Sequence, residues 1–236
     1  MDKKKALSTM GKAAVSAIPF VGGSIASLWS DLESSQIERK ISRFVGLVET
    51  LQSDFEVIKD KVNQDFVSAS DCQDIFEKMS KLVINERVEE KRFLYKNAYL
   101  NSMTSTIVDF DALERNLRLI EQLNTIEIHL LRLFDNPKLY NKNVGNIIRD
   151  PFIDANGNRL SSYMVDYFML EQIMRLLPRE IKKDDVYESI LFLTQNRIIK
   201  EGVVNKQLTT NGNPISIFDD VLTDKGKSFV KQLKSI

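Results

Sequence analysis

The sequence has few of the residues that form disulfides or bind metals. Its 236 residues include one cysteine, Cys72, and one histidine, His129. A single cysteine excludes an intrachain disulfide framework and is typical of a reducing compartment. His129 stands among isoleucine and leucine, with no second histidine or cysteine at metal-ligand spacing. We interpret it as a packed helical residue and expect no metal and no cofactor.

Net charge is also missing, because Lys plus Arg and Asp plus Glu both number 33. A nucleic-acid-binding protein normally has a basic excess or a basic face, so we expect no nucleic-acid partner. The glycines at 22–23 are not followed by the lysine of a phosphate-binding loop. The acidic pairs are adjacent in sequence and do not share one helix face: Glu89-Glu90, Asp184-Asp185 and Asp219-Asp220. We predict that the protein is not an enzyme.

A long uninterrupted apolar run is absent too. The nearest approach is the uncharged stretch 13–30, which follows the basic residues Lys3, Lys4, Lys5 and Lys12. A membrane-spanning helix needs about 20 predominantly apolar residues. Four serines, Pro19 and the pair Gly22-Gly23 interrupt this stretch. We expect two short apolar helices with a hinge at the glycine pair.

Three interpretations of the stretch 13–30 stay open. Its small residues stand four apart, the spacing that lets helices pack closely in lipid, and Trp29 suits the headgroup level. It could instead be a hairpin buried against a soluble core, or a cleaved signal peptide whose apolar part is interrupted. On the first interpretation the membrane-inserting residues are Ile18, Pro19, Phe20, Val21, Gly22, Gly23, Ile25, Leu28 and Trp29.

Apolar residues at alternating spacings of four and three predict a long helix after this stretch. No proline interrupts the pattern, and the helix could run from about residue 24 to 66. We expect its apolar seam to form a bundle or oligomer interface. The seam consists of Ile37, Ile41, Phe44, Val48, Leu51, Phe55, Ile58 and Val62.

Shorter helices are predicted to complete a bundle. One begins after Ser70 as N-cap. A second covers 85–102, with Phe93, Leu94, Ala98 and Met103 facing inward. A third covers 110–123, and a fourth restarts at Asn124-Thr125 and stops before Pro137. The predicted organisation is an apolar segment at 1–35, a helical bundle at 36–135 and a linker with a short hairpin at 136–162.

The last part, 163–236, is expected to form a separate domain. Helices at 163–177 and 184–195 are followed by apolar strands at Ile198-Ile199 and 215–218, and by the closing stretch LTDKGKSFVKQL. This order resembles a winged helix, so the predicted fold class is mainly α: a helical bundle followed by a winged-helix-like α+β domain. The candidate recognition helix begins with Asp184 and Asp185, whose charges oppose phosphate, which favours a protein partner over DNA.

Several stretches together resemble the bacterial abortive-infection alpha proteins. They are VEEKRFLYKNAYLNSM, FDALERNLRLIEQLNTIEIHLLRLF and LTDKGKSFVKQL. The start IPFVGGSIASL is similar to the N-termini of bacterial defence and cell-death proteins. The resemblance implies a role in phage defence with a self-limiting outcome for the infected cell, and it supplies no catalytic residues.

These observations lead to the hypothesis of a non-enzymatic anti-phage effector. At rest it is cytoplasmic, with the apolar segment folded against the bundle. On sensing a phage component it forms a homo-oligomer and permeabilises the inner membrane through that segment, so its partners are lipid, its own copies and a phage protein. One alternative is a prophage-associated winged-helix regulator that binds DNA. Another is a scaffold protein with a buried N-terminal hairpin.

Overall fold

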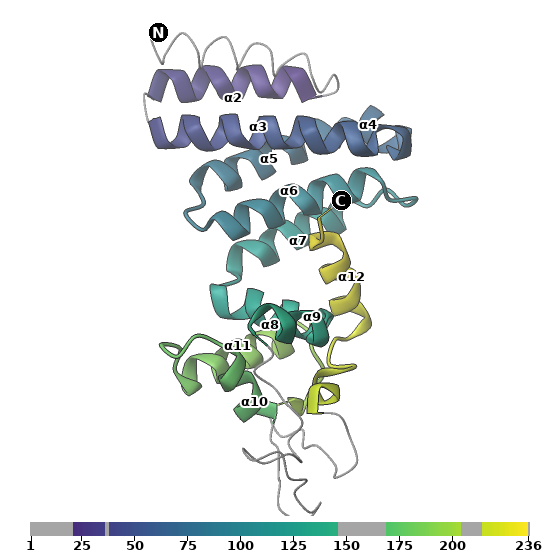
Figure 1. Cartoon of the computed structure of the whole chain (residues 1–236). Coiled ribbons are helices and arrows are strands. Elements are labelled where there is room, and N and C mark those ends of the chain that lie inside the picture. The colour runs from purple at the N-terminus through teal and green to yellow at the C-terminus, as the bar shows by residue number, and fades with distance from the viewer. Residues whose placement is uncertain (1–20, 36–37, 146–168, 204–213, 236) are drawn as a thin grey trace, which may run out of the picture. The chain divides into compact units, whose positions relative to one another are not determined.

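The computed structural model describes residues 21–35, 38–145, 169–203 and 214–235 (Figure 1). Within these ranges the chain forms eleven α-helices and no strand. The prediction of a mainly helical bundle is therefore confirmed. The chain divides into two compact units, Met1–Gln122 with Gln232–Ile236, and Leu123–Lys231.

Six helices and a short 3-10 turn build the first unit. They are α2 (Gly22–Ser35), α3 (Glu38–Ile58), η2 (Lys59–Lys61), α4 (Gln64–Ser68), α5 (Asp71–Asn85), α6 (Glu89–Met103) and α7 (Phe110–Gln122). Helix α3 packs on α2, α5 and α6, and α7 packs on α5 and α6. Buried aromatic and aliphatic side chains from α3, α5 and α6 fill the space between them, among them Phe44, Leu51, Phe76, Met79 and Tyr99.

The prediction of one continuous helix over 24–66 is wrong at both ends. Helices α2 and α3 are separate and run side by side (Figure 1). This arrangement lets Ile25, Leu28 and Leu32 become buried, whereas one straight helix would leave that face without a partner. At the other end the α-helix stops at Ile58, and Asn63 opens α4 by accepting a hydrogen bond from the Asp65 N–H at 2.9 Å.

Helix α6 is the central helix of the first unit, since ten of its fifteen residues are buried. Four of the buried residues are polar, and each has a partner. Lys91 pairs with Glu86, Lys96 with Asp54, the Asn97 amide donates to the Leu233 carbonyl, and the Ser102 hydroxyl donates to the Ala98 carbonyl. Leu94, Ala98 and Met103 face inward as expected, but Phe93 is 46% exposed. A buried polar group costs free energy unless it is paired, which explains how so charged a helix occupies the centre.

The second unit contains α8 (Thr125–Asp135), α9 (Pro137–Asn143), α10 (Met169–Leu176), α11 (Lys183–Gln195), η4 (Pro214–Phe218) and most of α12 (Asp224–Leu233). The restart at Asn124 is confirmed: its side chain caps α8, and Glu127 completes a capping box. Pro137 ends α8 as expected, yet it also opens α9 at its first position, inside the expected linker. The hairpin expected at 154–158 lies outside the described residues.

The expected α+β winged helix is not supported in the described part of the second unit. The first apolar stretch expected as a strand makes one antiparallel bridge, from Ile199 to Leu222, and the second, 215–218, makes none in the described ranges. The second stretch, Pro214–Phe218, is a 3-10 helix in which the adjacent residues Ile217 and Phe218 are both buried, unlike the alternate burial of a strand. Residues 204–213, between these two stretches, lie outside the described residues.

Candidate functional site

The predicted membrane-inserting residues that the structure describes lie on or beside α2. Val21 and Ile25 are 0% exposed and Leu28 is 5% exposed, while Gly22 is also buried. Trp29 is half-buried, with its ring centroid 6.4 Å from that of Phe44 on α3. Ile18, Pro19 and Phe20 lie outside the described residues. The apolar face of α2 is thus packed against α3 and α5.

The opposite face of α2 exposes four small side chains and one carboxylate. They are Gly23, Ala26, Ser27, Ser30 and Asp31. The glycine pair expected to be a hinge forms the first turn of α2, and the residues before Val21 lie outside the described ranges. Among the helices that the structure describes, none combines the length and apolar content needed to cross a bilayer.

The predicted seam on α3 faces other helices of the same chain. Phe44, Val48, Leu51 and Ile58 are buried, whereas Ile41, Phe55 and Val62 are half-buried. Ile37 lies outside the described residues, and Val62 follows η2 beyond the end of α3. Leu47, which the pattern did not include, is also buried. The seam residues pack where α3 meets α2, α5 and α6, so an interface between copies through them requires rearrangement.

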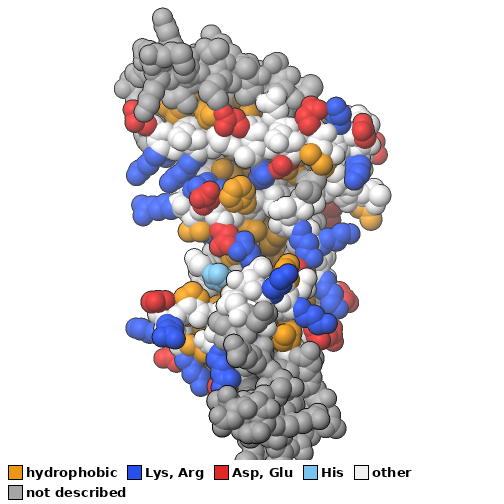
Figure 2. Space-filling model, viewed as in Figure 1, with side chains coloured by type: hydrophobic (Ala, Val, Ile, Leu, Met, Phe, Trp, Pro, Cys, Tyr) orange, Lys and Arg blue, Asp and Glu red, His pale blue; other side chains and the backbone are white. Residues whose placement is uncertain are grey.

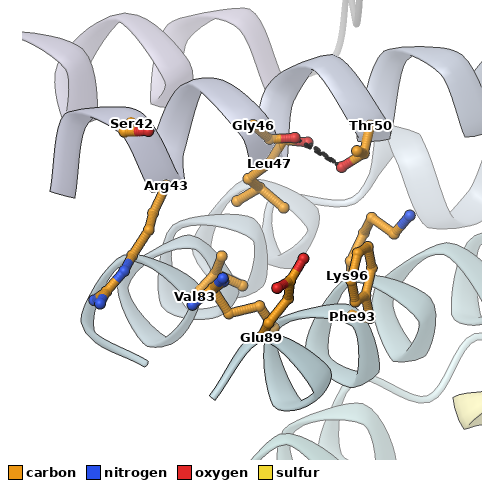
Figure 3. A pocket seen from close by; sticks show the side chains of 10 residues that line it. Ser42, Arg43, Gly46, Leu47, Thr50, Val83, Glu89, Phe93 and Lys96 are labelled. Carbon is orange, nitrogen blue, oxygen red and sulfur yellow. Dashed lines mark hydrogen bonds between the residues drawn. The ribbon is translucent and has the colours of Figure 1, made fainter. Parts of the chain in front are cut away.

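A cavity of about 250 Å³ lies between α3, α5 and α6 (Figure 3). Leu47 and Val83 give it an apolar side, and Ser42, Glu89 and Phe93 are exposed at its edge. Three cationic side chains line it against one carboxylate. Its lining residues are Ser42, Arg43, Gly46, Leu47, Thr50, Val83, Glu89, Arg92, Phe93 and Lys96.

Backbone carbonyls hold the two arginines of this cavity. Arg43 Nη1 donates to the Ile84 carbonyl at 3.0 Å, near the C-terminal end of α5. Arg92 Nη1 donates to the carbonyls of Glu86 and Arg87, at 3.2 and 3.1 Å. Within the described ranges neither guanidinium forms an ion pair with a carboxylate. Both charges are therefore fixed in place without being neutralised.

The third cation, Lys96, lies close to the aromatic ring of Phe93. Lys96 forms an ion pair with Asp54, and its Nζ atom lies 5.5 Å from the centroid of the Phe93 ring. In Figure 3, Phe93 and Glu89 border the cavity from α6, across from Gly46 and Thr50 on α3. The Thr50 hydroxyl is occupied, because it donates to the Gly46 carbonyl at 2.9 Å. The cation–π contact with the Lys96 ammonium restrains the exposed Phe93 ring.

A larger neighbouring cavity, of about 590 Å³, differs in its charge balance. Its lysines are paired: Lys78 with Glu114, and Lys81 with Glu77 at 3.6 Å. Its carboxylate Glu86 pairs with Lys91 at 3.2 Å. Burial alone would raise the pKa of Glu86, but the Val88 N–H and the Lys91 ammonium together lower this pKa below its usual value. Most of its charges are already satisfied inside the chain.

The two residues singled out for their rarity serve packing. Cys72 is buried on α5, and its Sγ atom lies 3.5 Å from the Tyr99 hydroxyl. Burial raises the pKa of this thiol, which makes it less reactive. His129 is half-buried on α8, with its Nδ1 atom 3.0 Å from the Tyr140 hydroxyl. No group of three His, Cys, Asp or Glu residues suited to a metal ion occurs in the described ranges.

Charges of both signs are interspersed on the face of the molecule seen in Figure 2. Comparison of the chain with protein-family models, with curated proteins and with solved structures finds no match. A function must therefore be argued from the chain's own residues, chiefly from the docked helix α2 and the cavity between α3, α5 and α6.

Proposed function

We propose that the protein is a non-enzymatic effector of bacterial phage defence that permeabilises the membrane through its N-terminal segment. The observation that carries the proposal is the docking of α2, whose apolar residues are buried against α3 and α5. A membrane-active segment must be covered in the resting protein, since an exposed apolar face of this kind causes aggregation. The link to phage comes from the resemblance of the central and C-terminal stretches to abortive-infection proteins.

Release of α2 requires a partner that binds the released state better than the docked one. Val21, Ile25, Leu28 and Leu32 are each at most 8% exposed. Burial of one such side chain contributes about 1.5–3 kcal/mol, so the docked state is strongly preferred in water. Anionic lipid or a phage protein can shift this equilibrium only by its differential affinity for the two states. Several released copies would then gather in the inner membrane.

The test weakens the docking of α2 without changing the sequence of the N-terminal segment. The variant Phe44→Ala removes the ring that faces Trp29 and leaves the stretch 13–30 unchanged. The matched control is Phe66→Ala, an equally buried ring that packs on Tyr99 and Phe110 instead. We expect purified Phe44→Ala to release dye from anionic liposomes faster than wild type and faster than Phe66→Ala. A second control, Phe44→Ala lacking residues 1–30, should release none.

Two outcomes would refute the membrane function. One is a folded Phe44→Ala variant, by circular dichroism, that releases no more dye than Phe66→Ala. The other is release that persists without residues 1–30. For the defence role, phage should form fewer plaques on cells that produce the full chain than on cells that produce a chain without residues 1–30. Equal plaque numbers across phages of several types would refute it.

The DNA-binding alternative stays a prediction: no strand supports a winged helix in the described part of the second unit, and residues 204–213 lie outside the described ranges. If neither dye release nor protection from phage is observed, the remaining alternative is a scaffold protein with a buried hairpin.

A further inference from the structure

The cavity in Figure 3 contains two arginines whose charge the chain does not neutralise. A guanidinium has five N–H donors and favours the bidentate geometry of phosphate and carboxylate groups. Arg43 uses one nitrogen for one carbonyl, and Arg92 uses one nitrogen for two. The other nitrogens of both side chains remain free to donate. The backbone contacts fix both side chains beforehand, which lowers the entropy cost of binding an anion.

The same cavity offers a flat apolar surface next to these charges. Phe93 is 46% exposed although it is a large aromatic side chain of the central helix. The Lys96 ammonium, itself anchored by Asp54, lies near its ring. A restrained aromatic ring at the edge of a basic cavity is suited to stacking against a nucleobase, as aromatic side chains do in single-strand binding sites.

A carboxylate completes the set. Glu89 lines the cavity at the start of α6, is exposed, and forms no ion pair within the described ranges. An ionised carboxylate only accepts hydrogen bonds, so it repels an anion but binds the hydroxyl groups of a sugar. Phosphate, base and ribose thus each have a matching group on α3 or α6.

We infer that this cavity is a binding site for a nucleoside monophosphate, with its phosphate on Arg43 and Arg92, its base on Phe93 and its ribose hydroxyls on Glu89. The volume of about 250 Å³ is just below the usual range for small-molecule sites, about 300–1,000 Å³, so the cavity suits one nucleotide at most. The neighbouring cavity is larger, but its lysines are already paired with carboxylates. The inference stands apart from the membrane function proposed above.

The test is isothermal titration calorimetry of the full chain with AMP, GMP, CMP and UMP, and with adenosine and inorganic phosphate as partial ligands. We expect at least one nucleotide to bind saturably and more tightly than either part. Arg43→Gln and Arg92→Gln should each weaken that binding about tenfold, the loss expected for one charge-assisted pair. Phe93→Ala should weaken it, whereas Phe93→Tyr should retain it.

Arg39→Gln is the matched control, since Arg39 is an exposed arginine on the same helix that does not line the cavity. Its affinity should equal that of wild type, and unchanged melting temperatures should show that all variants are folded. The proposal is overturned if no nucleotide saturates the protein. It is equally overturned if Arg39→Gln weakens binding as much as Arg43→Gln, or if inorganic phosphate binds as tightly as the nucleotides and Phe93→Ala has no effect.

Discussion

Ser80 is a buried residue without a hydrogen bond. Its hydroxyl lies in the core on α5 and has no partner, whereas the buried Ser102 hydroxyl on α6 donates to the Ala98 carbonyl at 2.8 Å. An unpaired buried hydroxyl costs about 1–3 kcal/mol, and alanine is the better helix former. We predict that Ser80→Ala stabilises the first unit by about 1 kcal/mol relative to Ser102→Ala. Chemical denaturation followed by the single tryptophan, Trp29, measures the difference, and equal stabilities would contradict the assigned environments.

Gly226 and Gly46 give opposite expectations for the same substitution. A Cβ atom at Gly226 on α12 would clash with the Ile198 backbone carbonyl, while one at Gly46 on α3 would meet no other atom within 4 Å. Gly46→Ala should therefore stabilise the protein by about 1 kcal/mol, the usual gain for a helix interior. Gly226→Ala should instead lower the melting temperature, because the clash is with backbone that cannot move cheaply. Calorimetry of both variants decides, and a stabilised Gly226→Ala protein would contradict this packing of α12.

At the same scale, the cavity lined by Arg43 and Arg92 could not have been predicted from the sequence. Arg43 and Arg92 are far apart in the chain and belong to no motif, and only the packing of α3 against α6 brings them to one cavity. The spacing of Phe93 with Leu94 and Ala98 predicted an inward ring. In the structure Phe93 lies on the exposed edge of α6, while Lys96 and Asn97 occupy buried positions of the same helix.

Among the elements, the start of α8 is the best specified by sequence. The Asn124 side chain accepts hydrogen bonds from the N–H groups of Ile126 and Glu127 at 2.7 and 3.1 Å, and the Glu127 carboxylate accepts one from the Asn124 N–H. Loss of such a cap costs about 1 kcal/mol. Asn124→Ala should therefore destabilise the second unit by about that amount, while Thr125→Ala, one residue later, should have a smaller effect. Thermal unfolding measures both, and an unchanged Asn124→Ala protein would refute the cap.

Capping residues and helical periodicity predicted where helices begin, but they did not always tell a helix from a strand. The starts of α7 and α8 were predicted within a residue because polar caps and breaks mark them. The strands expected at Ile198-Ile199 and 215–218 were wrong, since a short apolar run looks the same whether it becomes a strand or a buried turn. The long helix over 24–66 was wrong for another reason. A hydrophobic pattern does not record where the chain reverses so that α2 can pack on α3.

For the whole molecule, the central claim is that docking of α2 holds a membrane-active segment at rest. Truncation of a buried phenylalanine costs about 3–5 kcal/mol, and part of that loss at Phe44 falls on the docking of α2. A shift of about 5.5 kcal/mol takes a two-state equilibrium from 1:99 to 99:1. Because the loss at Phe44 is smaller than this shift, Phe44→Ala raises the population of the released state without making it the major state in water. Trp29 reports on that state directly, as the one tryptophan of the chain.

The most direct measurement is the fluorescence of Trp29 with anionic vesicles whose acyl chains are brominated, compared with the same vesicles unbrominated. Bromine quenches tryptophan only on close approach, so it reports entry of α2 into the acyl region. The account predicts strong quenching for Phe44→Ala and little for wild type or Phe66→Ala. Emission from a folded Phe44→Ala protein that is the same in both kinds of vesicle would contradict it, because α2 would then remain outside the bilayer even when its docking surface is removed.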